Sequence, residues 1–554
     1  MQFTRRDKCH LSIVTLVTRH RCRHVILYNR KKSAFFAAVG GVFVSPIINF
    51  ILRHQSLTWE SKGANAMSVQ SFYRVIDRKE RTYKTPVPYE KRPVEERTTD
   101  FDEVICGFNV ETAMAEAARC IQCPDPQPCL LNCPAGNDIP EALWLTSQGD
   151  FVGAAQVFAQ TSPLPEVCGR VCPMLCQRGC VLGKYNGAVT IGKIEAFVAN
   201  KAREAGVLAI NPPAQKTGKK VAVVGSGPAG ITVAQELVMK GHEITVFEAW
   251  PKAGGVLVYG IPNFKLNKYV VQEKIKDLEK AGVTFITNTR IGDKITIDDL
   301  LKEYDAVFLG TGASIEAKMD IPGEDLDGIY TSTDYLVRAN VPTEMLPPEK
   351  QQKYNIGKRV AVIGGGDTAV DCARSSIRLG AEEVTIVYRR TEAEMPGNKV
   401  ERGVCVEEGT KINYLQAPVE YIGDENGHVK AMKVIKMELG EPDASGRRRP
   451  VPIEGSEFIQ EVDTVVLAVG YWPDPFLGER TNDLVTHKWG LFLTDEEVGA
   501  TSKKGVFAAG DNVHGPDLVI TAIATAQKAA KHIEAYLNGE FEWPEIKKPE
   551  RRKR

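Results

Sequence analysis

The sequence has no excess of charge of either sign, because its 70 Lys and Arg residues balance its 70 Asp and Glu residues. A chain without a net field shows no bulk attraction to nucleic acid or to an anionic surface. We therefore expect no nucleic-acid partner. The length of 554 residues is enough for roughly three or four domains, each with its own core.

The sequence also lacks a clear secretory signal and has little that could cross a membrane. Only residues 34–52 form an uncharged run near the roughly 20 residues that a bilayer needs. The first 58 residues hold ten Lys and Arg but a single acid, a composition that fits a membrane anchor or a transit peptide. Pro46 and Asn49 inside the run weaken the anchor interpretation. We favour upstream sequence translated in error, with the true start at Met67, and expect no membrane contact unless the anchor is genuine.

Cysteine is concentrated in one stretch, since eight of the 13 cysteines fall between Cys120 and Cys180. Without a secretory signal, this crowding favours metal ligation over a disulfide scaffold and indicates a reducing, cytoplasmic location. The two groups have the spacings Cys120-x2-Cys123-x5-Cys129-x3-Cys133 and Cys168-x3-Cys172-x3-Cys176-x3-Cys180. A continuous helix would place the second group on one face. The interruptions at Gly169, Pro173 and Gly179 instead predict a segment that folds around a metal centre.

A dinucleotide fingerprint begins at the apolar strand 221–224. Gly225 permits a tight turn, Gly227 lets the backbone approach a pyrophosphate, and Gly230 allows close packing of helix on strand. A helix then leads to a second strand that ends in Glu248, which can accept a hydrogen bond from a ribose hydroxyl. Strand, helix and acid occur in the required order, so this stretch predicts a dinucleotide site.

Zinc and iron–sulfur both accept four thiolates, so the cysteine groups suit either. Three Cys-Pro pairs are typical of ferredoxin-like loops, and only one C-x2-C hook exists where a zinc ribbon would have two. A neighbouring redox site also favours an electron carrier, because zinc does not change its redox state. We rank iron–sulfur first, zinc second and disulfides last.

Three further segments supply candidate cofactor contacts. Gly255 belongs to a glycine-rich stretch, residues 254–262, that suits a flat cofactor. Gly312 ends an apolar strand in a Gly-Thr-Gly turn. Gly510 and Asp511 follow another apolar strand, and we expect Asp511 to be exposed there.

A second fingerprint contains Gly364, Gly366 and, at the third glycine position, Ala369. Its second strand ends in Arg389 and Arg390 instead of an acid. An acid would accept the ribose hydroxyl of NAD, whereas two guanidinium groups can bind a 2′-phosphate. The second site is therefore expected to prefer NADP over NAD.

These segments predict an α/β protein in which a helical N-terminal iron–sulfur domain precedes two doubly wound dinucleotide-binding domains, the first interrupted by the second. The alternation between Lys411 and Asp463 indicates antiparallel strands within the second. The expected organisation is an extension outside the fold at 1–66, an extended arm at 67–100, the helical domain at 101–205 and a linker at 206–218. The first nucleotide domain then comprises 219–344 and 471–540, the second 345–470, and a basic tail 541–554.

The chain resembles the small, flavin-carrying subunit of NADPH-dependent glutamate synthase. Related proteins are the N-terminal half of dihydropyrimidine dehydrogenase and the larger subunit of bifurcating ferredoxin:NADP oxidoreductase. The resemblance rests on segments 165–173, 189–195, 259–262, 388–396 and 509–511. It covers the chain from about residue 100 onward.

The resemblance implies FAD at the first fingerprint, NADPH at the second and two 4Fe–4S clusters in the helical domain. One cluster would be held by Cys120, Cys123, Cys129 and Cys180, and the other by Cys133, Cys172, Cys176 and Glu195. Cys168 would then be a bystander. The Cys123–Cys129 gap is one residue longer than the family's, and the Cys172–Cys176 gap is about two shorter. The ligand set, and with it the role of Cys168, stays open.

The resemblance further implies that electrons pass from NADPH through FAD and the clusters to a large glutamate synthase subunit. Other acceptors stay open: a bifurcating oxidoreductase or a pyrimidine reductase, or an assembly protein that carries electrons without turnover. No catalytic acid or base is required, because the cofactors carry the chemistry. No segment is left for amide transfer, since a substrate barrel needs about 250 residues. Cys372 and Cys405 lie far from any C-x-x-C, which argues against the related dithiol reductases.

Overall fold

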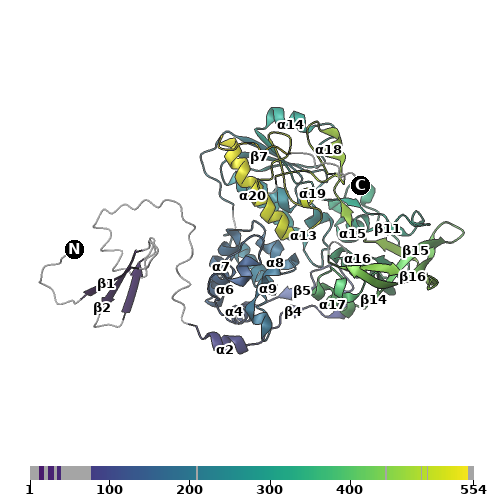
Figure 1. The fold of residues 1–554 in the computed structure, drawn as a ribbon, viewed down its shortest axis with the longest axis horizontal. Coiled ribbons are helices and arrows are strands. Elements are labelled where there is room, and N and C mark those ends of the chain that lie inside the picture. The colour runs from purple at the N-terminus through teal and green to yellow at the C-terminus, as the bar shows by residue number, and fades with distance from the viewer. Residues whose placement is uncertain are drawn as a thin grey trace. The chain divides into compact units, whose positions relative to one another are not determined.

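The computed structural model describes residues 76–207, 210–442, 446–487, 489–495 and 497–546, together with the backbone of three earlier strands. The chain divides into two compact units, Met1–Ile76 and Asp77–Arg554 (Figure 1). Each unit is considered by itself. The predicted basic tail lies outside the described residues from 547 onward.

The first unit contains a three-stranded antiparallel sheet in the order β1–β2–β3. Its strands are β1 (Leu11–Val17), β2 (Arg23–Asn29) and β3 (Ala34–Ala38). The candidate anchor at 34–52 is thus described only in β3, and the rest of it lies outside the described residues. No helix in the described part of the chain has the length and hydropathy to cross a lipid bilayer.

The second unit begins with a helical domain, drawn in blue in Figure 1. Asn109 and Thr112 form a capping box that starts α4, the helix leading to Cys120. As the proline and glycines predict, the second cysteine segment is broken: α8 ends before Pro173 and α9 begins after it. Between α10 and the next domain, the described residues form no helix or strand. The arm before the helical domain is not wholly extended as predicted, because its described residues form α2 (Arg78–Tyr83), β4 (Glu90–Lys91) and α3 (Val94–Arg97). The elements of the helical domain are β5 (Ile105–Gly107), α4 (Val110–Ala117), α5 (Pro128–Leu131), α6 (Ile139–Ser147), α7 (Phe151–Ala159), α8 (Pro165–Val171), α9 (Leu175–Gly179), η2 (Val181–Lys184) and α10 (Ile191–Glu204).

The first doubly wound domain is built on a parallel sheet in the order β21–β9–β6–β7–β8. Strand β21 returns to this sheet after the whole second domain, which confirms the predicted interruption. The elements are β6 (Lys220–Val224), α11 (Pro228–Val238), β7 (Glu243–Phe247), α12 (Val256–Tyr259), α13 (Lys268–Lys280), β8 (Thr284–Ile286), α14 (Ile297–Glu303), β9 (Ala306–Leu309), α18 (Phe476–Arg480), β21 (Val506–Ala508), α19 (Asp511–His514) and α20 (Val519–Leu537).

The second domain repeats the plan with a parallel sheet in the order β11–β19–β12–β13–β14. Its edge strand β11 precedes residue 345, so this sheet draws on chain from before the expected boundary. The elements are β11 (Ile329–Thr331), α15 (Ser332–Asn340), η3 (Thr343–Met345), η4 (Pro348–Lys350), β12 (Arg359–Ile363), α16 (Asp367–Arg378), β13 (Glu383–Tyr388), η5 (Glu392–Glu394), α17 (Lys399–Glu407), β14 (Lys411–Tyr414) and β19 (Thr464–Leu467).

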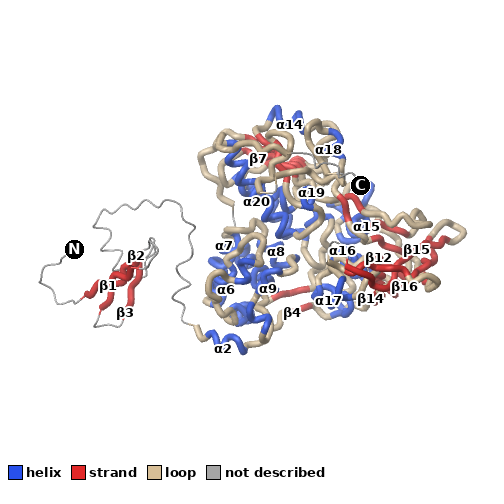
Figure 2. Tube along the Cα trace, viewed as in Figure 1, coloured by secondary structure: helices blue, strands red, loops and turns tan. Residues whose placement is uncertain are grey.

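An antiparallel sheet lies at the outer edge of the second domain in Figure 2, as the alternation between Lys411 and Asp463 predicts. It contains β15 (Gln416–Gly423), β16 (Val429–Pro442), β17 (Arg448–Pro452) and β18 (Phe458–Glu461). Strand β14 differs from the prediction, because it pairs in parallel with β13. The two chain crossings between the domains pair with each other as β10 (Ile315–Glu316) and β20 (Tyr471–Trp472).

The helical domain and the first doubly wound domain share one hydrophobic core. Leu164, Val167 and Cys168 of the α8 region are buried in the same cluster as Val258 and Ile523 of the nucleotide domain. Helix α8 packs against both α13 and α20, which Figure 1 shows beside it. The second cysteine segment is thereby anchored to the domain that carries the first fingerprint.

A buried charge cluster ties the arm before the helical domain to the second doubly wound domain. The carboxylate of Glu408 is fully buried and accepts hydrogen bonds from Arg97, Arg374 and Arg378. The nitrogen–oxygen distances are 3.0, 2.9 and 2.8 Å. The arm is therefore held at Arg97, which is itself buried.

We expect Glu408→Gln to destabilise the protein, because three buried guanidinium groups would lose their shared counter-charge. Breaking a buried ion pair costs about 3–5 kcal/mol. The matched control is Glu407→Gln: Glu407 also binds Arg97, but its side chain is 46% exposed, so we expect a loss below about 1 kcal/mol. Urea unfolding of the two variants measures the difference, and equal effects would contradict this account.

We expect a shortened chain that begins at Met67 to fold and to bind its cofactors like the full chain. Each hydrophobic core in the described residues lies within the second unit. Visible absorption spectra and thermal unfolding of the two chains should coincide. A shortened chain that aggregates or loses cofactor would show that the first 66 residues support the fold.

Candidate functional site

The first glycine turn follows β6 at the carboxyl edge of the sheet. Gly225 has a φ of +95°, and a Cβ there would lie 2.4 Å from the carbonyl oxygen of Gly310. A Cβ on Gly230 would lie 1.9 Å from the carbonyl oxygen of Gly225. These contacts require glycine at both positions. The space above Gly227 is open, since a Cβ there would meet nothing within 4 Å, and a phosphate can approach the backbone at this point.

Glu248 lies beside this turn at the end of β7 and is buried. Its carboxylate accepts hydrogen bonds from the backbone N–H of Ser226 at 3.2 Å and from that of Trp250 at 2.9 Å. It also accepts one from the Ser226 hydroxyl. Each carboxylate oxygen has two acceptor positions, so the group can still receive a ribose hydroxyl. Sequence reasoning did not identify Ser226, which orients this acid.

Other predicted cofactor contacts come to the same place. A Cβ on Gly255 would lie 2.7 Å from the Cα of Gly227, so the 254–262 stretch packs directly on the turn. A Cβ on Gly510 would lie 3.2 Å from the Cβ of Ala229, in the first turn of α11. Segments distant in sequence thus converge on the first fingerprint.

Asp511 differs from its predicted exposure, and its neighbour Asn512 was not predicted as a site residue. Asp511, expected to be exposed, is partly buried at the start of α19, and burial raises the pKa of its carboxyl to about 7. Its neighbour Asn512 is buried and donates from Nδ2 to the carbonyl of Leu309 at 2.9 Å. This amide joins α19 to the end of β9, where Gly312 follows with a φ of +71°. Folding buries Asp511 because α19 packs back over that strand end.

The second glycine turn repeats the geometry of the first. A Cβ on Gly364 would lie 2.1 Å from the carbonyl oxygen of Ala468, just after the neighbouring strand β19. The space above Gly366 is open, as at the first turn. Ala369 is fully buried where α16 packs on the sheet. The second turn therefore offers the same kind of phosphate cradle.

Basic side chains gather beside the second turn. The ring of Tyr388 lies against Gly365, where a Cβ would come within 2.5 Å of it. Burial raises the pKa of the Tyr388 hydroxyl. The nearby guanidinium charges of Arg390, Arg447 and Arg389 act in the opposite direction and lower this pKa. Arg447, which precedes β17, was not identified from the sequence. Only the tertiary structure brings it to the strand end that carries Arg389.

The two predicted arginines have different environments. Arg389 is exposed at the end of β13. Arg390 is buried, and its Nε donates to the carbonyl of Arg448 at 2.7 Å. Arg390 thus also holds β17 against the parallel sheet, which makes Arg389 and Arg447 the better candidates for direct contact with a 2′-phosphate.

The first predicted cluster site is a cavity in the helical domain. Its lining includes all four predicted ligands, Cys120, Cys123, Cys129 and Cys180, among apolar side chains. Burial raises the pKa values of Cys120 and Cys129 to about 12. A metal cluster binds thiolates, so its insertion here must displace protons. The arm contributes unpredicted contacts, since Arg81 donates to the carbonyl of Cys120 at 2.6 Å.

The second predicted site centres on Glu195. Electrostatic interactions of Glu195 reach Cys133, Cys172 and Cys176, the three cysteines assigned with it. The Glu195 side chain is buried, and in the described part of the chain its Oε1 has no hydrogen-bond partner. Burial raises the pKa of this carboxyl to about 8. An orphaned buried carboxylate among thiols fits a metal ligand, because coordination would satisfy it.

Cys168 also lies near Glu195, but it is buried in the shared core and contacts the hydroxyl of Ser162 at 3.8 Å. Among the described residues, no three His, Cys, Asp or Glu side chains lie close enough to hold a single metal ion. Ligands of an iron–sulfur cluster bind different iron atoms and are spread more widely. The described cysteines are all free thiols.

Two protein-family models match the chain in order. The first, described as dihydropyrimidine dehydrogenase domain II, 4Fe-4S cluster, matches residues 97–207. The second, described as pyridine nucleotide-disulphide oxidoreductase, matches residues 219–526. The first contains every predicted cluster ligand, and the second contains both glycine turns.

Curated relatives match most of the chain. The glutamate synthase (NADPH) small chain of Escherichia coli (strain K12) is 40% identical over 455 residues, covering 81% of this chain and 96% of that protein. The putative oxidoreductase AegA of the same organism is 38% identical over 472 residues, covering 84% of this chain and 72% of that protein.

Among solved structures, Mycobacterium tuberculosis FprA in complex with NADPH is similar with a TM-score of 0.50 at 22% sequence identity. The match covers 58% of this chain and 85% of that one. It supports the fold of the two doubly wound domains.

We expect Glu195→Ala to lose one of two clusters while flavin content stays intact. Anaerobically purified protein should hold about eight irons and eight sulfides per chain, and the variant about four of each. Cys168→Ala is the matched control, because Cys168 lies at the same site but is assigned no iron. Iron, sulfide and flavin analyses decide the matter. Full iron content in Glu195→Ala would refute Glu195 as a ligand. Loss of a cluster in Cys168→Ala alone would assign the ligand position to Cys168 instead.

Proposed function

The chain belongs to the family of pyridine nucleotide-disulphide oxidoreductases that includes the glutamate synthase (NADPH) small chain, and on that premise we propose that it supplies a larger partner subunit with electrons from NADPH. The family matches confirm the resemblance seen in the sequence. The protein is an NADPH-dependent oxidoreductase that uses FAD and 4Fe–4S centres.

The observation that carries the proposal is the presence of two glycine turns and two cysteine groups in one compact unit. When bound, FAD accepts a hydride from NADPH and releases electrons singly to iron–sulfur centres. The residues of the chain bind and position these groups. Gly227 and Glu248 would hold the flavin nucleotide, and Gly366 with Arg389 and Arg447 would hold NADPH.

The two cysteine groups differ in their neighbours, and this suggests their order. Cys172 packs against the core that the helical domain shares with the first nucleotide domain. The other cysteines of its group, Cys133 and Cys176, pack with Cys120 and Cys129 in the helical domain's own core. Through Cys172, the Glu195 group would be the entry point for electrons and the four-cysteine group the exit.

The exit side has exposed apolar residues near the ligands in sequence. Leu131, two residues after Cys129, is 65% exposed, and Tyr185, five residues after Cys180, is 63% exposed. We place the partner interface on this side because electrons would leave through the four-cysteine group. We infer that the partner is the large subunit of a glutamate synthase, in a reducing, cytoplasmic compartment. Another electron-accepting subunit is the alternative.

Replacing Arg389 by Ala should raise the KM for NADPH and leave that for NADH nearly unchanged. A lost charge-assisted contact costs about 1.5–3 kcal/mol, or one to two decades in affinity. Arg447→Ala should act in the same direction. The control is Arg449→Ala, which replaces an exposed arginine on β17 and should change neither constant. Steady-state kinetics with both nucleotides test this, and equal effects on NADPH and NADH would refute the phosphate contact.

The isolated chain should oxidise NADPH with ferricyanide or a tetrazolium dye as acceptor. It should form no glutamate from glutamine and 2-oxoglutarate until a large synthase subunit is added, because the described domains are occupied by cofactor sites. Glutamate formation by the single chain would refute the proposal. If the chain instead passes electrons to a pyrimidine reductase or a ferredoxin, its assignment as an NADPH-dependent oxidoreductase would stand. Its proposed role in glutamate synthesis would be refuted.

A further inference from the structure

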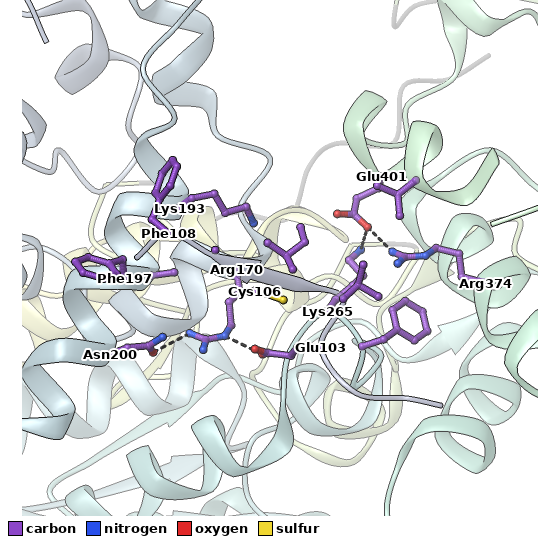
Figure 3. A pocket seen from close by; sticks show the side chains of 16 residues that line it. Glu103, Cys106, Phe108, Arg170, Lys193, Phe197, Asn200, Lys265, Arg374 and Glu401 are labelled. Carbon is purple, nitrogen blue, oxygen red and sulfur yellow. Dashed lines mark hydrogen bonds and ion pairs between the residues drawn. The ribbon is translucent and has the colours of Figure 1, made fainter. Parts of the chain in front are cut away.

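A cavity of about 230 Å³ lies where three domains of the second unit meet, and none of the residues assigned to the cofactors lines it. The helical domain, the segment after α12 and the second nucleotide domain each contribute to its wall (Figure 3). Its charged lining residues are Glu103, Arg170, Lys193, Lys265, Arg374 and Glu401. Nothing in the proposed function uses this space.

The charged residues are paired, with one exception. The ion pairs are Arg170–Glu103 at 2.8 Å, Lys265–Asp371 at 3.0 Å and Arg374–Glu401 at 2.7 Å. Lys193 on α10 forms no ion pair or hydrogen bond with any described residue, and its ammonium lies 5.8 Å from the ring centre of Tyr89. Figure 3 shows this ammonium pointing from the helix toward the interior of the cavity. A partly buried cation without a partner is costly, and an anion would remove that cost.

A second donor group, that of Arg170, lines the same cavity. Arg170 uses Nε for Glu103 and Nη1 for Asn200 at 3.2 Å, but its Nη2 donates to no described residue. The Lys193 ammonium is attracted by the carboxylates of Glu401 and Glu103 and repelled by Arg170 and Lys265, but it forms an ion pair with neither carboxylate. An oxyanion bound in the cavity would give this ammonium a direct partner.

Apart from Asn200, the remainder of the wall is chiefly apolar. It consists of side chains from all three domains, chiefly Val104, Phe108, Phe197, Phe264 and Val404. The volume has room for several waters, which suits a short-chain molecule. We propose that the cavity binds a small organic carboxylate, its carboxylate on Lys193 and its hydrocarbon against the phenylalanines.

The position suggests what such a ligand does. Lys193 belongs to α10, the helix that also carries Glu195, while Arg374 belongs to α16, the helix that follows the second glycine turn. A ligand held between these helices ties the cluster-binding domain to the NADPH-binding domain. The site is therefore suited to an effector that couples the two.

Cys106 provides a direct test, because its exposed thiol lines the same cavity. Iodoacetate is itself a small carboxylate, and iodoacetamide is its neutral counterpart. With either reagent the thiolate sulfur forms a bond to the methylene carbon, iodide leaves, and the thiol proton passes to solvent. The full-length holoprotein is treated with each reagent, and peptide mass spectrometry measures the rate at Cys106.

We expect the ratio of the iodoacetate rate to the iodoacetamide rate at Cys106 to fall about tenfold or more in Lys193→Met. Lys193→Arg should retain the ratio. Lys201→Met is the matched control, an exposed lysine on the same helix, and should also leave it unchanged. An unchanged ratio in Lys193→Met would overturn the proposal. Flavin and iron spectra verify that each variant is intact.

Calorimetry of the holoprotein tests the ligand class. Butyrate should bind once per chain, with the affinity reduced at least about tenfold in Lys193→Met. Butylammonium should not bind, and inorganic phosphate should bind more weakly than butyrate because it leaves the apolar wall uncovered. Butyrate binding that survives in Lys193→Met, or phosphate binding as tight as butyrate binding, would overturn the proposal.

Discussion

The arrangement of the second unit depends on one shared hydrophobic core. Helix α8 contributes Leu164, Val167 and Cys168 to the same buried cluster as the first doubly wound domain. Apolar burial contributes roughly 25 cal/mol per Å², so a helix embedded in this way does not separate easily from its neighbour. Since α8 leads directly to Cys172, the shared core fixes a proposed cluster ligand beside the flavin-binding domain. Efficient electron transfer requires such a fixed arrangement.

The second junction is held by charge. Glu408 is surrounded by three arginines, one of them from the arm that precedes the helical domain. The planar guanidinium of Arg374 binds both oxygens of the carboxylate, at 2.9 Å each. Such pairs are directional and lose their energy when one partner shifts. The helical domain is therefore joined to one nucleotide domain by apolar packing, and the arm that precedes it is joined to the other by geometry-dependent ion pairs.

Each glycine turn shows why the local sequence carried so much information. In both domains, the first glycine faces the carbonyl oxygen that follows the neighbouring strand, Gly310 in one and Ala468 in the other. No side chain fits at 2.4 or 2.1 Å, so the sequence must contain glycine wherever this turn forms. The broken helix at Pro173 was equally readable, because proline lacks the N–H that a helix interior needs. Such local steric rules made the fold class and the two glycine turns predictable.

Only the tertiary structure decided which segments that are far apart in the chain come into contact. Arg447 comes close to the end of β13, where Arg389 lies, because β17 folds back toward the sheet. No local sequence pattern predicts this contact. Arg390 had the same sequence signal as Arg389, yet it is buried by a backbone contact to Arg448. Asp511 was expected to be exposed but is partly buried under long-range packing. By itself, the sequence determined the turns, the strand–helix order and the cofactor class, because these depend on local sterics and ligand chemistry. Burial and pairing of individual charges were decided by the fold, because they depend on which distant segment arrives beside them.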